Sequence, residues 1–178
     1  RVLYAQLLNC LQRNDEALIQ GLLAIELDPL NPLVQVWYAA VLMGVGDFEP
    51  ALAIGEKVIA DDPGNYLGNN LIEAAAFACG ENDKVMEAAR YILPVKGVDF
   101  KEVERIYREL GFVAAYEEAL RQLEVLAQKG FTAPGEMAIR YMRVDQPEKA
   151  LEWLEKGFEV RDPVMPYIAT HAFLFDPL

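Results

Sequence analysis

The sequence lacks the residues from which most hydrolytic and metal sites are built. Serine is absent, threonine occurs only at Thr132 and Thr170, and His171 is the only histidine. A serine triad is therefore excluded, and one histidine with two distant cysteines, Cys10 and Cys79, does not form a zinc cluster. We expect no catalytic residue, no metal ligand, no cofactor and no enzymatic activity, and we expect His171 to pack within an aromatic tail.

Other chemical motifs are equally scarce. The glycines of Gly44–Asp47 are not followed by the Lys and Ser or Thr of a phosphate loop, so this stretch predicts a turn. Carboxylate pairs such as Asp61-Asp62 are expected on solvated helix ends. Cys10 and Cys79 lie two repeats apart in the pattern described below, about 20 Å at about 8–10 Å per packed helix. Because a disulfide needs Cα atoms within roughly 7 Å, we expect both cysteines to be reduced and structural.

Basic residues are few relative to acidic ones, and long apolar runs are missing. The 178 residues carry a formal net charge of −12, and 53% of them are apolar. Nucleic-acid binding needs basic surface and is disfavoured, and no stretch is apolar for the roughly 18 residues of a membrane helix. The first residues resemble a helix and not a signal peptide, and no initiator Met precedes them, so we expect either a fragment of a longer protein or a chain whose start is disordered. The reduced cysteines expected above fit a cytoplasmic setting.

What the sequence has is an internal repeat of 34 residues. Ten positions between residues 4 and 31 recur as identical residues 34 positions later, where chance would give about two. The recurring residues are Tyr38, Ala39, Leu42, Ala51, Leu52, Gly55, Ile59, Asp62, Pro63 and Asn65. The Ala17-Leu18 pair returns as Ala51-Leu52, Val85-Met86, Ala119-Leu120 and Ala150-Leu151. The pattern predicts five units, approximately 1–30, 31–64, 65–98, 99–130 and 131–163, with a tail at 164–178, in one domain.

Each unit has the same internal order. Apolar residues at helical spacing predict a first helix, a break follows, and a second helix runs through the Ala-Leu pair. Pro29, Pro63 and Pro163 then predict helix ends, because proline disfavours helix at the residue before it. Asn31 and Asn65 are placed to cap the next helix. The small residues of the second helix, among them Ala17 and Ala51, allow a close approach to its neighbour.

A 34-residue period with two helices per unit resembles the tetratricopeptide repeat family over roughly residues 1–163. The resemblance implies an all-α fold, a solenoid of about five helix-turn-helix units plus a short C-terminal helix or tail. In such a superhelix the first helices line a concave surface.

The C-terminal stretch resembles the last unit of arrays found in bacterial multidomain regulators. In those proteins the array follows a winged-helix activator, a nucleotide cyclase or a protein kinase. The resemblance rests on Ala150–Lys156, Arg161–Pro163 and Phe175–Leu178, whereas Thr170-His171 stands where an Asp-Pro pair is usual. It implies a docking or sensing part of a larger regulator, which would be periplasmic only if a membrane span preceded it.

The family resemblance also implies which residues face the concave groove. In the second and third units they are mostly apolar and small, which suits an amphipathic partner helix; the alternative is that they pack between repeats or against the chain's own tail. The predicted positions are Val36, Trp37, Ala40, Met43, Leu67, Asn70, Leu71, Ala74 and Phe77.

The corresponding positions of the fourth and fifth units are basic. They are Lys101, Arg105, Arg108 and Arg143, with Arg140 close by. Arginine holds carboxylates in a bidentate geometry, so an acidic peptide or a C-terminal carboxylate is one interpretation. Pairing of these cations with Glu104, Glu109 and Glu136 is the other.

Two functions remain open from the sequence. The first is a non-catalytic scaffold that binds a protein or peptide partner in its groove, without nucleic acid or membrane. The second is self-association, because Val2, Leu3 and Leu7 begin the chain without the polar surface expected at the end of a repeat array.

Overall fold

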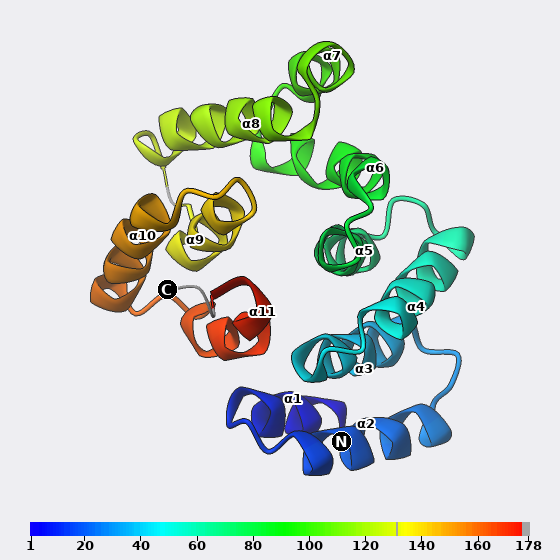
Figure 1. The fold of residues 1–178 in the computed structure, drawn as a ribbon. Coiled ribbons are helices and arrows are strands. Elements are labelled where there is room, and N and C mark those ends of the chain that lie inside the picture. The colour runs from blue at the N-terminus through cyan, green and yellow to red at the C-terminus, as the bar shows by residue number, and fades with distance from the viewer. Residues whose placement is uncertain (131, 176–178) are drawn as a thin grey trace. The chain divides into compact units, whose positions relative to one another are not determined.

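The computed structural model describes residues 1–130 and 132–175, and within these ranges the chain is helical throughout and contains no strand (Figure 1). The all-α prediction is therefore confirmed for the described residues. Phe131 and the last part of the Phe175–Leu178 motif, residues 176–178, lie outside them. No described helix is both long enough and apolar enough to cross a membrane.

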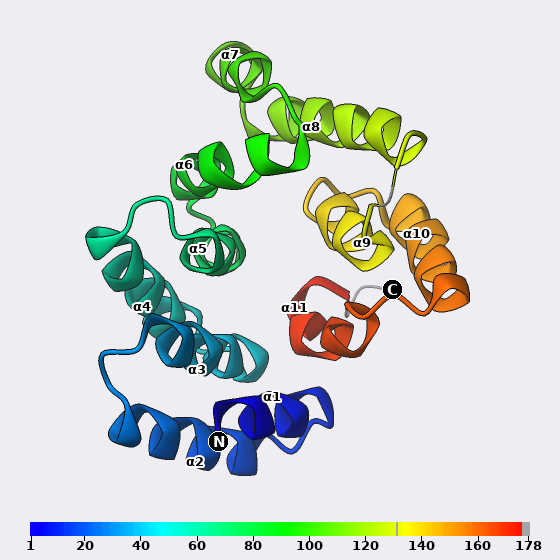
Figure 2. The ribbon, with the colours of Figure 1, turned by 180° about the vertical axis from the view of Figure 1, so that it is seen from behind.

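The chain divides into two compact units, and the first contains residues 1–91 together with Ala169–Phe173. Its helices follow one another as antiparallel pairs (Figures 1 and 2). They are α1 (Val2–Cys10), α2 (Asn14–Leu27), α3 (Pro32–Val45), α4 (Phe48–Asp61), α5 (Tyr66–Ala78) and α6 (Asn82–Ile92), the last ending at the unit boundary.

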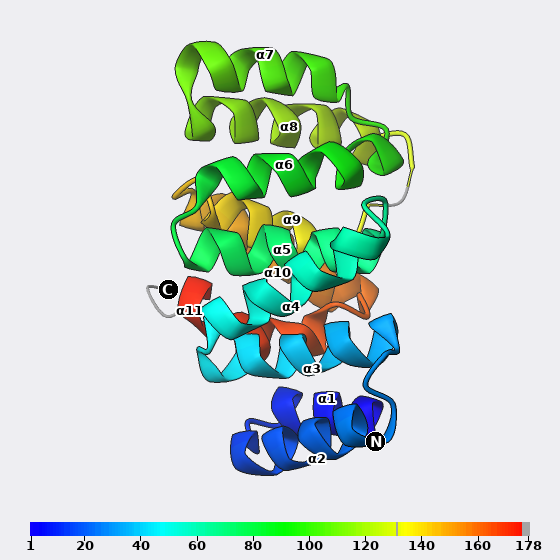
Figure 3. The same ribbon diagram turned by 90° about the vertical axis from the view of Figure 1, so that its right-hand side faces the viewer.

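Among the described residues, the second unit contains residues 92–168 together with Leu174 and Phe175. Here α7 lies beside α8, and α9 lies beside α10 (Figure 3). Its elements are the 3-10 turn η1 (Pro94–Lys96), α7 (Phe100–Leu110), α8 (Phe112–Ala127), α9 (Pro134–Met142) and α10 (Pro147–Val160). The 3-10 helix η2 (Met165–His171) and α11 (Ala172–Phe175) follow, with Ala169–Phe173 belonging to the first unit.

The 34-residue period of the sequence recurs in the helix boundaries. The first helices α3, α5, α7 and α9 begin at residues 32, 66, 100 and 134, and the second helices α2, α4 and α6 begin at residues 14, 48 and 82. Each start lies 34 residues after the one before it in its series. The helix α8 departs from this spacing because it begins at Phe112, directly after Gly111.

The joints between units are built from repeated hydrogen bonds. Asn31 caps α3 by accepting hydrogen bonds from the backbone N–H groups of residues 33 and 34, and Asn65 caps α5 by accepting one from Gly68. Both caps agree with the sequence prediction. Buried amides hold the proline turns, since Gln35 donates to the Pro29 carbonyl at 2.6 Å and Asn69 donates to the Pro63 carbonyl at 2.9 Å.

The last joint uses a buried carboxylate instead. Asp162 is only 4% exposed, and its carboxylate accepts hydrogen bonds from the backbone N–H of Gly135 at 2.7 Å and of Val164 at 3.0 Å. Gly135 lies in the first turn of α9, where backbone N–H groups have no partner within the helix. Asp162 therefore ties the end of the α10 segment to the beginning of α9.

Glycines on the second helices receive large side chains from the next unit. A Cβ atom on Gly21 of α2 would lie 2.6 Å from Cδ2 of Tyr38, and a Cβ on Gly55 of α4 would lie 2.8 Å from Cγ1 of Ile72. Real Cβ contacts are longer, so both glycines are required by packing. We call these two positions the glycine notches.

One local prediction needs correction. The break expected at Gly44–Asp47 begins later, because α3 continues through Gly44 and ends at Val45; Gly46 then forms a left-handed C-cap with φ 87°. The segment between α6 and α7 contains η1 and a left-handed Gly97 with φ 89°.

Candidate functional site

The first helices of the second and third units form an apolar hollow within the first unit. Its volume is about 180 Å³. Val36, Trp37, Ala40 and Met43 from α3 face residues Leu67, Asn70, Leu71 and Ala74 from α5, and Thr170 and His171 complete the wall. We call this site the α3–α5 hollow.

The hollow gathers eight of the nine groove residues predicted for these two units. Phe77 is half-buried elsewhere and does not line it. Helical periodicity brings the others together, because residues three and four apart lie on one face of a helix. The predicted arrangement is thus present, and whether a partner occupies it stays a prediction.

The two wall residues that were not assigned to the groove come from the C-terminal segment Ala169–Phe173. This segment is held against the first unit at two points. Gln12 donates a hydrogen bond from Nε2 to the carbonyl of Ala169 at 3.0 Å, and the rings of Phe48 and Phe173 lie 4.9 Å apart. One of the two interpretations from the sequence was that the groove residues pack against the chain's own tail. In the structure, Thr170 and His171 of the tail form part of the wall of the hollow.

The chemistry of the hollow is that of an apolar receptor. Asn70 is the most polar group contributed by α5, and its Nδ2 already donates to the Tyr66 carbonyl at 2.8 Å. At the tail, the Thr170 hydroxyl lies 3.3 Å from Nδ1 of His171. Cavities of about 150 Å³ lined by aliphatic side chains hold one benzene ring. The hollow therefore has room for one aromatic or branched side chain, and less than the roughly 300 Å³ of a typical small-molecule site.

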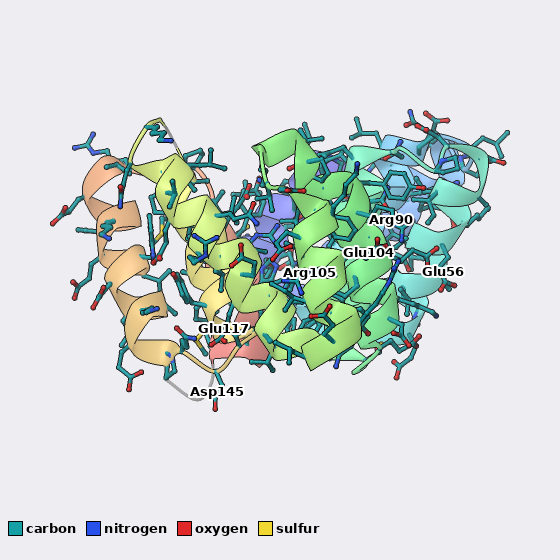
Figure 4. The ribbon with its side chains drawn as sticks, turned by 90° about the horizontal axis from the view of Figure 1, so that it is seen from above. Glu56, Arg90, Glu104, Arg105, Glu117 and Asp145 are labelled. Atoms are coloured by element: carbon teal, nitrogen blue, oxygen red, sulfur yellow. The ribbon has the colours of Figure 1, made fainter. Side chains whose placement is uncertain are left out.

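The predicted basic positions fall into two different environments in the second unit. Lys101, Arg105 and Arg108 lie on the exposed side of α7, where Arg105 pairs with Glu102 at 2.7 Å and with Glu109 at 2.5 Å. Arg108 pairs with Glu104 at 3.0 Å; Figure 4 labels Glu104 and Arg105 on α7. The hydrogen bond from Arg105 lowers the pKa of the Glu102 carboxyl. These are the i to i+3 and i to i+4 pairs of a solvated helix face.

Arg143 is instead buried, together with Arg140. Their side chains are 7% and 5% exposed, and each donates a hydrogen bond from Nη1 to the hydroxyl of Tyr116, at 2.6 Å and 2.8 Å. The guanidinium carbons lie 5.9 Å and 5.8 Å from the centre of the Tyr116 ring. This cluster joins α9 to α8. Of the glutamates expected to pair with these cations, Glu136 pairs with Lys96 of η1 instead.

Metal-ligating and nucleophilic groups were also sought among the described residues. They contain no group of three metal-ligating side chains. Cys10 and Cys79 are free, and burial raises the pKa of both thiols, which disfavours the reactive thiolate.

Comparisons of the chain with protein-family models, with curated proteins and with solved structures find no match. The resemblance to tetratricopeptide repeats therefore rests on the 34-residue period, the Ala-Leu pairs and the proline joints. The function has to be argued from the site itself.

Proposed function

We propose that this chain is a non-catalytic scaffold of tetratricopeptide type whose α3–α5 hollow binds an apolar helical segment of a partner protein. Its helix pairs would continue as a superhelix, and it would be the docking part of a larger bacterial regulator. The observation that carries the proposal is the hollow itself. It is apolar, it is built from first helices, and it is too small for a cofactor but large enough for one bulky side chain.

The small residues of the hollow support a helical partner. Ala40 and Ala74 lie on facing helices and are both half-exposed, while Val36 and Leu71 beneath them are buried. Two alanines at the surface of a groove allow a helix backbone to approach closely, as in the helix-in-groove mode. One aromatic or leucine side chain of that helix would fill the hollow as its anchor.

The segment Ala169–Phe173 defines a probe for this site, because it already lies at the edge of the hollow. A fluorescein-labelled peptide of residues 164–175 carries the same aromatic sequence. In the wild-type chain the attached segment competes at high effective concentration. Loosening it with Phe173→Ala, which removes the ring packed on Phe48, should make the free peptide bind at least tenfold more tightly.

Filling the hollow should abolish this binding. Ala40→Phe in the Phe173→Ala background places a ring inside the hollow, whereas Ala53→Phe adds the same ring to an exposed position of α4. Fluorescence anisotropy should show peptide binding with the Ala53 variant and none with the Ala40 variant. Equal binding by both variants would refute the hollow as the docking site.

A further inference from the structure

A larger pocket of the first unit lies between the second helices α4 and α6, with α5 between them forming its floor (Figure 3). Its volume is about 360 Å³, which lies within the range of small-molecule sites, roughly 300–1,000 Å³. It shares no lining residue with the α3–α5 hollow. We call it the α4–α6 pocket.

The middle of the α4–α6 pocket is apolar. Ile59 and Ala60 come from α4, Ile72 from α5, and Ala88 and Tyr91 from α6. The Tyr91 side chain is 39% exposed, so one face of its ring is open to a ligand. Aromatic rings pack well against such a ring in tilted or offset geometries. This part of the pocket therefore suits a flat apolar body.

The wall towards the middle of α4 and the start of α6 carries an excess of negative charge. It contains Glu56, labelled on α4 in Figure 4, together with Lys84 and Glu87. Lys84 pairs with Glu56 at 2.7 Å and with Glu81 at 2.8 Å, and the hydrogen bonds to these two carboxylates raise the pKa of Lys84. One ammonium group thus lies among three carboxylates, and a cationic ligand is favoured there.

Asn69 supplies a buried acceptor in the floor of the pocket. The residue is 0% exposed, and its Nδ2 donates to the carbonyls of Pro63 and Asn65, both at 2.9 Å. Its Oδ1 accepts no hydrogen bond from any described residue. Gln35, 34 residues earlier, likewise uses its amide NH₂ group to hold a proline turn. The joint therefore needs only the donor end of the Asn69 amide, and the oxygen remains for another donor.

The acceptor and the carboxylates lie towards opposite ends of the pocket. Glu56 follows Gly55, which packs against Ile72 of α5. Asn69 is tied instead to Pro63, beyond the end of α4. Asn69 and Ile72 are three residues apart, which is about 4.5 Å along a helix axis. The distance between the two ends is thus close to the size of one aromatic ring.

We propose that the α4–α6 pocket binds a small aromatic amine that carries a hydroxyl group at the end of its ring opposite the amine. The ammonium group lies beside Glu56 and Glu87, the ring packs on Tyr91, and the hydroxyl donates its hydrogen bond to Oδ1 of Asn69. Tyramine has these three features and is the probe for the test.

Isothermal titration calorimetry of the full chain compares tyramine with two matched compounds. We expect saturable binding of tyramine. Phenethylamine lacks the hydroxyl and leaves Oδ1 of Asn69 unpaired, so it should bind about tenfold more weakly or worse. The acid para-hydroxyphenylpropionate replaces the ammonium by a carboxylate and should not bind. Absence of saturable tyramine binding, or equal affinity for tyramine and phenethylamine, would overturn the proposal.

Two pairs of variants locate the binding. Ala60→Phe fills the pocket from an exposed position and should abolish tyramine binding, whereas Ala53→Phe adds the same ring to α4 outside the pocket and should leave it unchanged. Glu87→Gln should weaken binding about tenfold, while Glu26→Gln removes the same charge on α2 without effect. Equal tyramine affinity within each pair would also overturn the proposal. None of the four positions lines the α3–α5 hollow, so the result is independent of peptide binding there.

Discussion

Replacing Gly55 by alanine sets two physical effects of similar size against each other. Gly55 lies inside α4, where alanine stabilises a helix by about 1 kcal/mol relative to glycine. The new Cβ, however, would lie 2.8 Å from Cγ1 of Ile72 and 3.4 Å from Cδ2 of Leu71. Both neighbours are nearly inaccessible, at 4% and 6% exposure, so the new methyl group would meet packed side chains.

The packing effect should prevail. Adding a methyl group to a filled core costs about 1–3 kcal/mol, which exceeds the gain in helix propensity. We therefore expect Gly55→Ala to lower the free energy of unfolding by about 1 kcal/mol, or the thermal midpoint by about 2–4 °C for a protein of this size.

Removing the neighbour should reverse the sign. Ile72→Ala alone leaves a cavity and costs about 2–5 kcal/mol. In that background the Cβ at position 55 no longer meets Cγ1 and fills part of the cavity instead. Gly55→Ala should then stabilise the protein by about 1 kcal/mol, which gives a coupling of about 2 kcal/mol between the two positions.

Urea unfolding followed by far-UV circular dichroism measures all four proteins of this cycle. The control is Ala53→Gly on the exposed side of the same helix, which reports helix propensity alone and should cost about 1 kcal/mol. A stabilising Gly55→Ala in the wild-type background, or additive effects in the cycle, would refute the notch as a packing requirement.

Three further predictions concern the joints and the second unit. Asn31→Ala should lower the free energy of unfolding by about 1 kcal/mol in urea, because α3 loses its N-cap. Asp162→Ala should lower it by about 2 kcal/mol or more, since the buried N–H of Gly135 loses its acceptor. Burial, and then the hydrogen bond with Glu124, raise the pKa of Tyr141, so the folded state favours the neutral phenol. The resulting contribution to the free energy of unfolding is fully present below about pH 10 and is lost as the pH rises through the raised pKa. Between pH 9 and pH 11 the stability of Tyr141→Phe should therefore change less than that of the wild-type chain.

Local patterns were sufficient for the joints and the helix starts. Proline and asparagine act on the backbone within a few residues, so Pro29 and Asn31 could be assigned from the sequence, and α2 and α3 end and begin as expected. The prediction that the helix breaks at Gly44 was wrong, because the side chain that requires glycine there is distant in the sequence. Its Cα lies so close to the buried Asn9 side chain that a Cβ would fall 2.3 Å from Oδ1, and glycine there serves a contact and not a turn.

The candidate site was predictable to the extent that it depends on periodicity. The α3 and α5 residues of the hollow share one helix face each, and a 34-residue period brings the faces together. The basic positions show the limit of the same reasoning. Arg105 and Arg143 were both predicted to face the groove, yet one is 53% exposed at its side chain and the other is buried beside Tyr116. The packing of α8 against α9 is what buries Arg143.

The sequence by itself therefore determined the helical class, the 34-residue spacing, the capped joints and the apolar residues of the hollow, because these depend on interactions within one or two helices. The tertiary structure alone decided two features. It placed Ala169 beside Gln12, 157 residues earlier in the chain, and it buried two arginines around one tyrosine hydroxyl. Each depends on which surfaces meet across long chain separations, and this is set by the fit of side-chain volumes and buried polar groups that no short-range pattern records.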